Sequence, residues 1–324
     1  MIEIIKPGIY VSVQDKGRNG YYEIATPPSG ALDEYSFVAS NLLVGNDEND
    51  ACLEVAYLGP TIEFKGNYTI AITGGEMPPK LNGNPIPMWE SIKVKSGDIL
   101  SFDFIKKGAR TYIAISGGID VPIVMGSRST YSAIGIGGYK GRILKEGDIL
   151  NINNNKHLSS DKKGILPDSL IPKFKKEYEI NVVLGMCSYR FMEESIEDFF
   201  ECEWKVTPEA DRIGYRLKGT QLRFIEREQP FGAGSNPSNI VDSGYSIGSI
   251  QIPNGTEPIV LLKDAVTCGG FVTIGTVVSA DLNIMGQIKT GETIKFNKVT
   301  IDQALLIRKN YQQKLQTLKH YFSD

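Results

Sequence analysis

The sequence predicts a mainly β protein with two related β units in tandem and only a few helices. Two observations support this fold class: short strand-like runs along the whole chain, and short patterns that recur in both halves. The runs are rich in Val, Ile, Tyr, Phe and Thr and end in Gly, Asn, Asp or Pro, which is typical of strands joined by turns. The clearest runs are Ile9–Val13, Tyr68–Thr73, Arg110–Ile115, Ile180–Leu184, Pro258–Leu262 and Phe271–Ile274.

Two short patterns indicate that related β units were joined. A glycine followed by an acidic residue directly precedes an apolar strand start at Ser96–Leu100, Glu146–Leu150 and Thr290–Ile294. A second pattern, Gly-x-x-(Ile/Leu)-x-Phe, occurs once in each half, at Gly59–Phe64 and Gly219–Phe224. Both patterns favour a repeated β architecture.

A polar, asparagine-rich stretch without apolar period, residues 151–175, separates the halves. We therefore predict an N-terminal β domain at 1–152, a polar linker at 153–175, and a C-terminal β domain at 176–324 that ends in a helix. Three helices are expected in all.

The expected helices are Asp33–Leu43, Tyr189–Phe200 and Asp302–Tyr321. The first is followed by Gly45, a common helix stop. Asp33 is a candidate N-cap, because an Asp side chain can accept a hydrogen bond from the first-turn amides.

Composition and charge exclude several classes of protein. The chain has 41% hydrophobic and 23% charged residues, close to soluble globular proteins. Its net charge of -3 argues against a nucleic-acid partner, since such proteins carry a basic surface. No apolar run approaches the ~20 residues of a membrane span, and a Pro-Gly break at residues 7–8 interrupts the N-terminal apolar stretch too early for a signal peptide. We expect a cytoplasmic protein.

The residues that are scarce narrow the chemistry further. The four cysteines are widely spaced, so neither a zinc site nor a disulfide framework is expected. The two histidines, His157 and His320, do not support Ser-His-Asp or Cys-His catalysis. Acid-base work is left to carboxylates, Lys or Tyr.

Familiar cofactor motifs are absent from the sequence. It has no phosphate-binding P-loop and no dinucleotide-binding glycine fingerprint. No methionine is followed by lysine, so the chain lacks the Met-Lys-Met type site at which carrier domains hold biotin. We predict no metal and no covalent biotin on this chain.

Two polar clusters near the N-terminus are candidate site segments. In Val13–Arg18, Asp15 and Arg18 surround a glycine that can bring backbone amides close to a ligand; the alternative is a turn with a surface ion pair. In Pro28–Asp33, Asp33 either faces a site or caps the helix that follows.

A third cluster is the strongest local signal for an anion site. Gly126–Thr130 and Ile134–Arg142 combine hydroxyls and glycines with the cations Arg128, Lys140 and Arg142. Arginine side chains and free backbone amides both bind oxyanions. The alternative is a flexible glycine loop with solvated charges.

The C-terminal half repeats the combination of acid, arginine and glycine. Pro208–Gly214 contains Asp211 and Arg212, and Lys263–Gly270 places Asp264 near a Gly-Gly turn. Gln251, in Ile250–Gly255, is expected near the same turn; the alternative for Lys263 and Asp264 is an exposed strand end. These residues predict a polar cleft between the halves.

Read together, these segments resemble the family that includes the C subunit of 5-oxoprolinase, the KipA proteins and the carboxyltransferase region of urea carboxylase. The ordered matches run almost end to end, at residues 7–21, 29–33, 41–46, 53–54, 58–60, 117–119, 121–122, 126–130, 137–138, 141–142, 211–214, 248–253, 258–259, 264, 269–270 and 281–282.

The resemblance implies two cyclophilin-like β-barrel halves with a cleft between them. It implies one component of a complex whose other members are a KipI-like protein and a LamB/YcsF-like protein, and which opens 5-oxo-L-proline to L-glutamate at the expense of ATP. Arg128 would bind the substrate carboxylate, and Asp15 or Asp264 would manage protons. The complex would use ATP, and which of its members binds ATP is left open.

The resemblance also gives a set of site residues. The predicted catalytic residues are Asp15, Arg18, Asp33, Asp211, Arg212 and Asp264. The predicted substrate-binding residues are Gln14, Ser29, Gly30, Gly126, Ser127, Arg128, Ser129, Thr130, Gly138, Gln251, Gly269 and Gly270.

Two other functions fit the same resemblance. One is a biotin-dependent carboxyltransferase acting on a urea-like amide with a separate biotin carrier. The other is a KipA-type regulator that binds and antagonises a KipI-like inhibitor of a sensor kinase. The chain departs from the common family pattern Asp-x-Gln-Thr-Thr-Gly-Gly-Tyr-Pro at Val266, Cys268, Phe271 and Val272.

Overall fold

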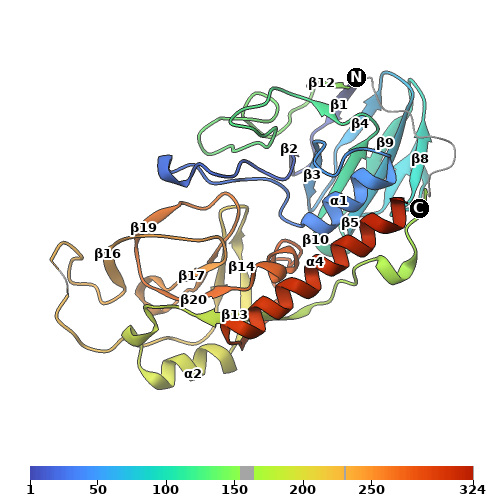
Figure 1. Cartoon of the computed structure of the whole chain (residues 1–324). Helices are drawn as coiled ribbons and strands as arrows, with labels where there is room; N and C mark the ends of the chain where they lie inside the picture. The colour runs from blue at the N-terminus through green and yellow to red at the C-terminus, as the bar shows by residue number, and fades with distance from the viewer. Residues whose placement is uncertain (154–163, 230, 324) are drawn as a thin grey trace. The chain divides into compact units, whose positions relative to one another are not determined.

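The computed structural model describes residues 1–153, 164–229 and 231–323, and over these residues the chain is mainly β, as predicted (Figure 1). His157 and much of the predicted linker lie outside the described residues. None of the described helices combines the length and the hydropathy that crossing a membrane requires.

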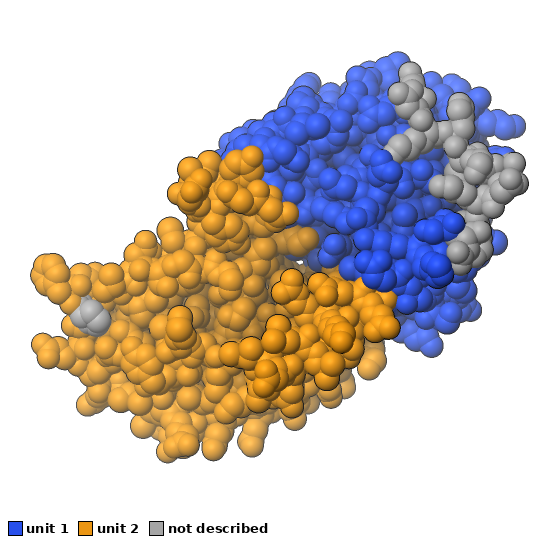
Figure 2. All heavy atoms as spheres, viewed as in Figure 1, with its two compact units in different colours: residues 1–18, 29–174, 314–324 blue, residues 19–28, 175–313 orange. Residues whose placement is uncertain are grey.

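The chain forms two compact units, which are coloured separately in Figure 2. Unit 1 consists of residues 1–18, 29–174 and 314–324, and unit 2 of residues 19–28 and 175–313. The division predicted from chain order differs from these units at three places: residues 19–28 belong to unit 2, while the described end of the predicted linker and the end of the C-terminal helix belong to unit 1.

Packing explains why the end of the predicted linker belongs to unit 1. Leu166 is 2% exposed, and its backbone N–H donates to the Trp89 carbonyl at 3.0 Å. Ile165 forms a β-bridge with Glu90. The polar composition of this stretch concealed these contacts, because they are made by only two apolar residues.

Unit 1 contains two antiparallel sheets around one core. The larger sheet has the order β11-β12-β1-β4-β9-β6-β7, and the smaller has the order β2-β3-β10-β5-β8. The core takes side chains from both sheets, among them Ile4, Val13, Leu53, Ile62 and Ile113. The strands are β1 (Ile2–Lys6), β2 (Tyr10–Gln14), β3 (Cys52–Ala56), β4 (Thr61–Phe64), β5 (Tyr68–Glu76), β6 (Pro79–Leu81), β7 (Asn84–Pro85), β8 (Ser91–Val94), β9 (Ile99–Phe102), β10 (Lys107–Ile115), β11 (Ile119–Asp120) and β12 (Ile149–Ile152).

Helix α1 (Glu34–Leu43) packs on the smaller sheet of unit 1. The Thr73 hydroxyl of β5 donates to the Ser36 carbonyl at 2.7 Å. Asp33 is the N-cap, and its side chain accepts from Ser36 N at 3.1 Å and from Ser36 Oγ at 2.6 Å. The predicted helix and its predicted cap are therefore both confirmed.

Unit 2 is a closed barrel with the strand order β13-β20-β17-β18-β15-β14-β21. Barrel closure was predicted for both halves; it is complete in unit 2, while unit 1 has two sheets. Strands β13 and β21 run parallel and the other neighbours antiparallel. The barrel strands are β13 (Glu177–Leu184), β14 (Glu203–Ala210), β15 (Gly214–Lys218), β17 (Ser249–Gln251), β18 (Ile259–Leu261), β20 (Thr273–Val277) and β21 (Thr293–Lys298).

The remaining elements include a two-stranded sheet of β16 (Asn239–Gly244) and β19 (Cys268–Phe271). Helix α2 spans Glu193–Glu201, α3 Leu282–Met285 and α4 Ile301–Ser323. The sequence predicted α2 and α4. It did not predict α3, which has a single turn and so carries little periodic signal.

Candidate functional site

The carboxylate of Asp15, directly after β2, is the centre of a buried polar network in unit 1. Asp15 is only 3% exposed, so the surface turn that the sequence left open does not form. Four donors surround its oxygens: Gly17 N at 2.7 Å, Ser127 Oγ at 2.6 Å, Arg128 N at 2.6 Å and the Ser129 hydroxyl. Charge-assisted bonds of this kind are the strong ones in proteins. Asp15 therefore holds the Gly126–Thr130 loop.

Arg18 fixes the same loop from another side. It is 1% exposed and donates through Nη2 to the Ser129 carbonyl. The glycines that follow pack tightly here: a Cβ at Gly137 would lie 2.0 Å from the Ser129 oxygen, and one at Gly138 would lie 1.8 Å from Thr130 Oγ1. Side chains are excluded at both positions, so this is a packed loop and not a flexible one.

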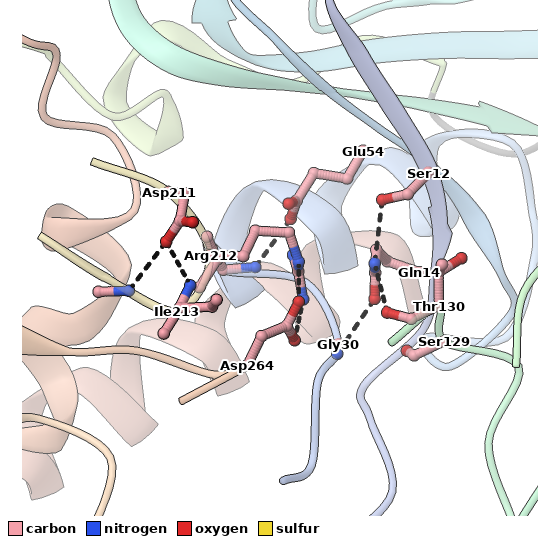
Figure 3. A network of polar contacts seen from close by, with 12 residues as sticks. Ser12, Gln14, Gly30, Glu54, Ser129, Thr130, Asp211, Arg212, Ile213 and Asp264 are labelled. Atoms are coloured by element: carbon pink, nitrogen blue, oxygen red, sulfur yellow. Dashed lines mark hydrogen bonds and ion pairs between the residues drawn. The ribbon is translucent and has the colours of Figure 1, made fainter. Parts of the chain in front are cut away.

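Gln14 joins the same loop to the segment before α1. Its Nε2 donates to Ser12 Oγ at 3.0 Å and to the Thr130 carbonyl at 3.2 Å, and its Oε1 accepts from Gly30 N at 3.1 Å (Figure 3). Ser29 is fully buried in a left-handed conformation with a φ of 53°. Gln14 therefore connects Ser12, Gly30 and Thr130.

Successive backbone N–H groups of residues 30–33 each donate to a different acceptor of unit 1. Gly30 donates to Gln14 Oε1, Ala31 to the Asp15 carbonyl at 2.9 Å, Leu32 to Glu54 Oε2 at 2.8 Å and Asp33 to Tyr112 Oη at 2.8 Å. All these acceptors lie on, or directly after, strands β2, β3 and β10. The segment before α1 is thus held rigidly by the sheet.

Sequence reasoning missed Glu54, Arg110 and Tyr112 as site candidates. Glu54 is 1% exposed, accepts a hydrogen bond from the Tyr112 hydroxyl at 2.8 Å, and lies 3.6 Å from Arg110 Nε. Burial, followed by the charges of Glu54 and Asp33, raises the pKa of Tyr112 well above its usual range. The available signal was a glutamate within the apolar run Cys52–Ala56, because a buried charge needs a partner.

Arg128, the predicted carboxylate binder, directs its guanidinium at protein oxygens. Its Nη1 donates to the Val121 carbonyl and lies 3.5 Å from Asp120 Oδ1. The side chain is 25% exposed. Its backbone N–H donates to Asp15 Oδ2, so Arg128 stabilises the loop through both its main chain and its side chain.

The other two cations of the third cluster differ in their surroundings. Arg142 forms a bidentate ion pair with Asp148, at 2.7 and 2.8 Å. Lys140 is exposed and lies 5.0 Å from the centroid of the Tyr139 ring. Arg142 also lies over the Tyr139 ring, with its Cζ 5.6 Å from the centroid, so Lys140 and Arg142 share this ring, while the guanidinium of Arg128 contacts Val121 and Asp120.

In unit 2, Arg212 and Asp264 form a buried bidentate ion pair (Figure 3). Arg212 Nε donates to Asp264 Oδ2 at 2.8 Å and Nη2 donates to Oδ1 at 3.0 Å, and each side chain is 5% exposed. Asp211, by contrast, is exposed and accepts from the backbone N–H groups of Ile213 and Gly214 at 2.8 and 3.1 Å.

The last predicted residues of unit 2 lie around Tyr245. The Tyr245 hydroxyl donates to the Phe271 carbonyl and accepts from Phe271 N, both at 2.7 Å. A Cβ at Gly269 would lie 3.0 Å from the Tyr245 ring. Gln251 lies in β17, which pairs with β18 and β20, and Gly270 belongs to β19.

A family model matches most of this chain. The carboxyltransferase domain, subdomain A and B, matches residues 24–298. The chain belongs to this carboxyltransferase family. The family that the sequence motifs indicated is thereby confirmed.

Members of the carboxyltransferase family that resemble this chain fall into two kinds. The urea amidolyase of Saccharomyces cerevisiae is 39% identical over 98% of this chain, which spans 18% of that longer protein. The C subunit of the Escherichia coli 5-oxoprolinase is 34% identical over 98% of this chain and 97% of its own length. The chain thus matches only a part of the yeast urea amidolyase, whereas it matches almost the full length of the Escherichia coli C subunit.

Solved structures of this carboxyltransferase family support the fold. The crystal structure of the Kluyveromyces lactis urea carboxylase has a TM-score of 0.90 and 39% identity, covering 98% of this chain and 29% of that one. The urea amidolyase of the same yeast gives the same TM-score, and the match covers 20% of that chain.

The family positions at which this chain departs from the common pattern differ in burial. Val272 is fully buried, whereas Val266 is 55% exposed, Phe271 is 40% exposed and Cys268 is exposed. The catalytic and binding roles given to the motif residues stay predictions. The contacts establish that Asp15, Arg18, Asp33 and Arg212 each hold a defined part of their own unit.

Proposed function

We propose that the chain is the C subunit of an ATP-dependent 5-oxoprolinase complex, which hydrolyses 5-oxo-L-proline to L-glutamate. The observation that carries this proposal is the match to the C subunit of the Escherichia coli enzyme, which covers 98% of this chain and 97% of that protein. A second protein of that name, from Haemophilus influenzae, is 31% identical over 100% of this chain. The two matches cover 97% and 99% of those proteins.

The proposed partners are a KipI-like protein and a LamB/YcsF-like protein, with the complex in the cytoplasm. Opening a stable lactam requires coupling to ATP. In the proposed reaction, the γ-phosphoryl group of ATP is transferred to the amide oxygen, a first water attacks the activated carbon, and the C–N bond breaks to release the amine and leave an acyl phosphate. A second water hydrolyses the acyl phosphate to the L-glutamate carboxylate and phosphate. This chain has no P-loop, and we assign ATP to the complex without naming the member that binds it.

The contribution we propose for unit 1 is a preorganised loop. Asp15 and Arg18 hold Gly126–Thr130 in place, and Gly137 and Gly138 pack against it. Because its hydroxyls and the Arg128 amide already donate to Asp15 and Val13, the loop keeps a fixed shape and can line a substrate site with little reorganisation. The arrangement is suited to binding a small polar ligand.

A second candidate function is that of a biotin-dependent carboxyltransferase that acts on a urea-like amide. The observation that favours it is the higher identity, 39%, to the urea amidolyase of Saccharomyces cerevisiae. Because this chain spans 18% of that protein, carboxylation would need further domains, including a biotin carrier.

Reconstitution separates the candidates. The chain, the KipI-like protein and the LamB/YcsF-like protein are purified, mixed in all combinations, and assayed for ATP hydrolysis and glutamate formation with 5-oxo-L-proline. We expect turnover only when all three are present. Turnover with urea, bicarbonate and a biotin carrier, and none with 5-oxo-L-proline, would select the carboxyltransferase. Tight binding to the KipI-like protein without any turnover would select the KipA-type regulator.

Variants test the loop in the same assay. Asp15→Ala is expected to lower turnover by about 100-fold, because misplacing a binding loop by an ångström costs that much. Arg128→Ala removes a cation of the loop, and Lys309→Met, which replaces an exposed lysine of α4, is the matched control. Turnover unchanged in both Asp15→Ala and Arg128→Ala would contradict the assignment of the site to this loop.

A further inference from the structure

Arg190 is a buried arginine of unit 2 that no motif identifies. It ends the short 3-10 helix η3 (Ser188–Arg190) and is 3% exposed. Its Nη1 donates to the Asn239 carbonyl of β16 at 2.6 Å, while its Nε is buried without a hydrogen-bond partner among residues 1–153, 164–229 and 231–323. Burying a guanidinium costs free energy unless its charge and its donors are matched. The described residues match them only in part.

A second arginine, Arg227, lies close to Arg190. The Arg227 Cζ is 5.6 Å from the centroid of the Tyr189 ring. Hydrogen bonding to Arg227, and then to Arg190, lowers the pKa of the Tyr189 hydroxyl below its usual range. Two guanidinium groups are therefore gathered around one tyrosine.

The two segments that carry these side chains are fixed to each other. The Ile225 N–H donates to the Arg190 carbonyl at 2.9 Å. The next residue along, Phe191, forms a β-bridge with Phe224, and the centroids of their rings are 4.8 Å apart. Tyr189 and the segment that leads to Arg227 therefore form one preorganised surface.

The charges of the two arginines are not matched by carboxylates of the described chain. Neither Arg190 nor Arg227 forms an ion pair within residues 1–153, 164–229 and 231–323, although exposed glutamates stand on both sides of Arg227 in the sequence. Another buried arginine of unit 2, Arg212, has Asp264 as its bidentate partner. Arg190 is thus a buried cation that still needs a negative charge.

Exposed apolar side chains lie on the same two segments. Met186 is 96% exposed, Tyr189 is 63% exposed and Ile225 is 45% exposed, and Arg227 is also exposed. Tyr, Met and Arg are enriched in protein interfaces, and Tyr and Arg often dominate the binding energy. The arginine surface, as we call Met186, Tyr189, Arg190, Ile225 and Arg227, therefore has the composition of a protein-binding surface.

We propose that the arginine surface binds an acidic side chain of a partner protein. Arg227 and Tyr189 contact the carboxylate, and the buried charge of Arg190 attracts it. The apolar neighbours exclude water from this contact and so strengthen it. The partner is the KipI-like protein, which both the proposed function and the KipA-type regulator require, so its identity rests on the proposed function.

The first test is calorimetric titration of the full chain with the KipI-like protein. Arg227→Met should weaken binding at least about tenfold, the loss expected for one charge-assisted hydrogen bond. Arg227→Glu should weaken it at least about 100-fold, because it sets like charges against each other. Arg308→Met removes an exposed arginine elsewhere in unit 2 and is the matched control, with unchanged affinity.

Arg190→Gln tests the buried charge itself. Glutamine keeps a donor for the Asn239 carbonyl and removes the positive charge. We expect about tenfold weaker binding and a smaller loss of affinity with added salt than in wild type. A lower melting temperature with unchanged affinity and salt dependence would overturn this role, because Arg190 would then be purely structural.

Photo-cross-linking locates the contact without changing an arginine. The cross-linker p-benzoyl-L-phenylalanine in place of Met186 should join the chain to the KipI-like protein. In place of Leu305, which is 57% exposed on α4, it should not. Both side chains are exposed, so neither replacement disturbs the core.

The outcomes separate this inference from the proposed function. Unchanged affinity of Arg227→Glu, or cross-links from position 305 alone, overturns the arginine surface while the proposed function stands. Binding that depends on Arg227, without turnover of 5-oxo-L-proline by the three proteins, supports the surface and contradicts the 5-oxoprolinase proposal. The KipI-like protein is wrong as the occupant if it does not bind wild type. It is also wrong if Arg227→Glu weakens only binding of the LamB/YcsF-like protein or only self-association of this chain.

Discussion

Two segments that each combine an aspartate, an arginine and a glycine, Asp15–Arg18 in unit 1 and Asp211–Gly214 in unit 2, form different structures. In unit 1 the acid is buried, and its long-range partners are Ser127, Arg128 and Ser129. In unit 2 the acid is exposed and accepts from the backbone of its own turn. The roles of acid and arginine therefore differ between the units.

The arginine makes the long-range contact in unit 2. Arg212 reaches Asp264, which is 52 residues away in the chain. In unit 1 both Asp15 and Arg18 reach the same loop, across more than 100 residues. An acid, an arginine and a glycine close together in the chain thus do not determine the partner of each charge, because that partner depends on the tertiary structure around it.

The largest expected effect is the contrast between Asp15→Ala and Asp211→Ala. Asp15→Ala removes an acceptor from four buried donors and is expected to lower the free energy of unfolding by about 4 kcal/mol. Asp211→Ala removes an exposed turn acceptor and should cost about 1 kcal/mol or less. Urea denaturation of each variant checks this. Equal losses in the free energy of unfolding would mean that the two carboxylates contribute equally to stability.

The next effect concerns the buried ion pair of unit 2. Asp264→Ala removes the bidentate partner of Arg212 and is expected to lower the free energy of unfolding by about 3 kcal/mol. The exposed pair of Arg216 and Glu257 is the control, where Glu257→Ala should cost about 0.5 kcal/mol. A loss below that of the control would show that the Arg212 pair is not the buried contact described.

Acid stability should differ in sign between an acid of unit 1 and an acid of unit 2. The hydrogen bonds from Arg142 lower the pKa of Asp148 below 3.8, so its contribution is present at neutral pH and is lost as the pH falls through the folded value. Burial raises the pKa of Asp281 above 3.8, so its contribution is present at low pH and is lost as the pH rises.

Unfolding free energies measured from pH 7 to about pH 3 test these signs. The unfolding free energy of wild type minus that of Asp148→Asn should decrease as the pH falls. The unfolding free energy of wild type minus that of Asp281→Asn should increase as the pH falls. The same slope for both variants would contradict the assigned surroundings of one of these acids.

The smallest expected effect is a gain from Ser29→Gly. Ser29 has a φ of 53°, a region that favours glycine, and its hydroxyl is buried without a hydrogen-bond partner among the described residues. Relief of this strain should raise the free energy of unfolding by about 0.5 kcal/mol. Asn254, with the same φ, is the control in unit 2, since its side chain accepts from Asn236 at 2.6 Å. A higher free energy of unfolding in Asn254→Gly, with no increase in Ser29→Gly, would show that Ser29 is not the strained position.

The sequence was informative about local structure. Asp33 capping α1, the helix pattern of α4 and the strand runs all depend on residues close together in the chain, so periodicity and turn residues predict them. The contacts of Glu54 with Arg110 and Tyr112 depend on the register of β3 against β10. No local pattern encodes that register.

The end of α4 shows the same limit. Its helical pattern was predicted, but its assignment to unit 1 through Leu318, Tyr321 and Lys314 follows from contacts with residues far away in the chain. The glycines at 137 and 138 were recognised as a loop signal. Their reason is steric, and it appears only when Ser129 and Thr130 are placed beside them.

Asp15 holding the Gly126–Thr130 loop is the contact on which the proposed site depends, and a double-mutant cycle tests it most directly. Asp15→Ala, Ser127→Ala and the double variant are compared by urea denaturation. We expect a coupling free energy of about 1–2 kcal/mol between the two sites. Additive losses, with a coupling free energy below about 0.3 kcal/mol, would contradict this role of Asp15.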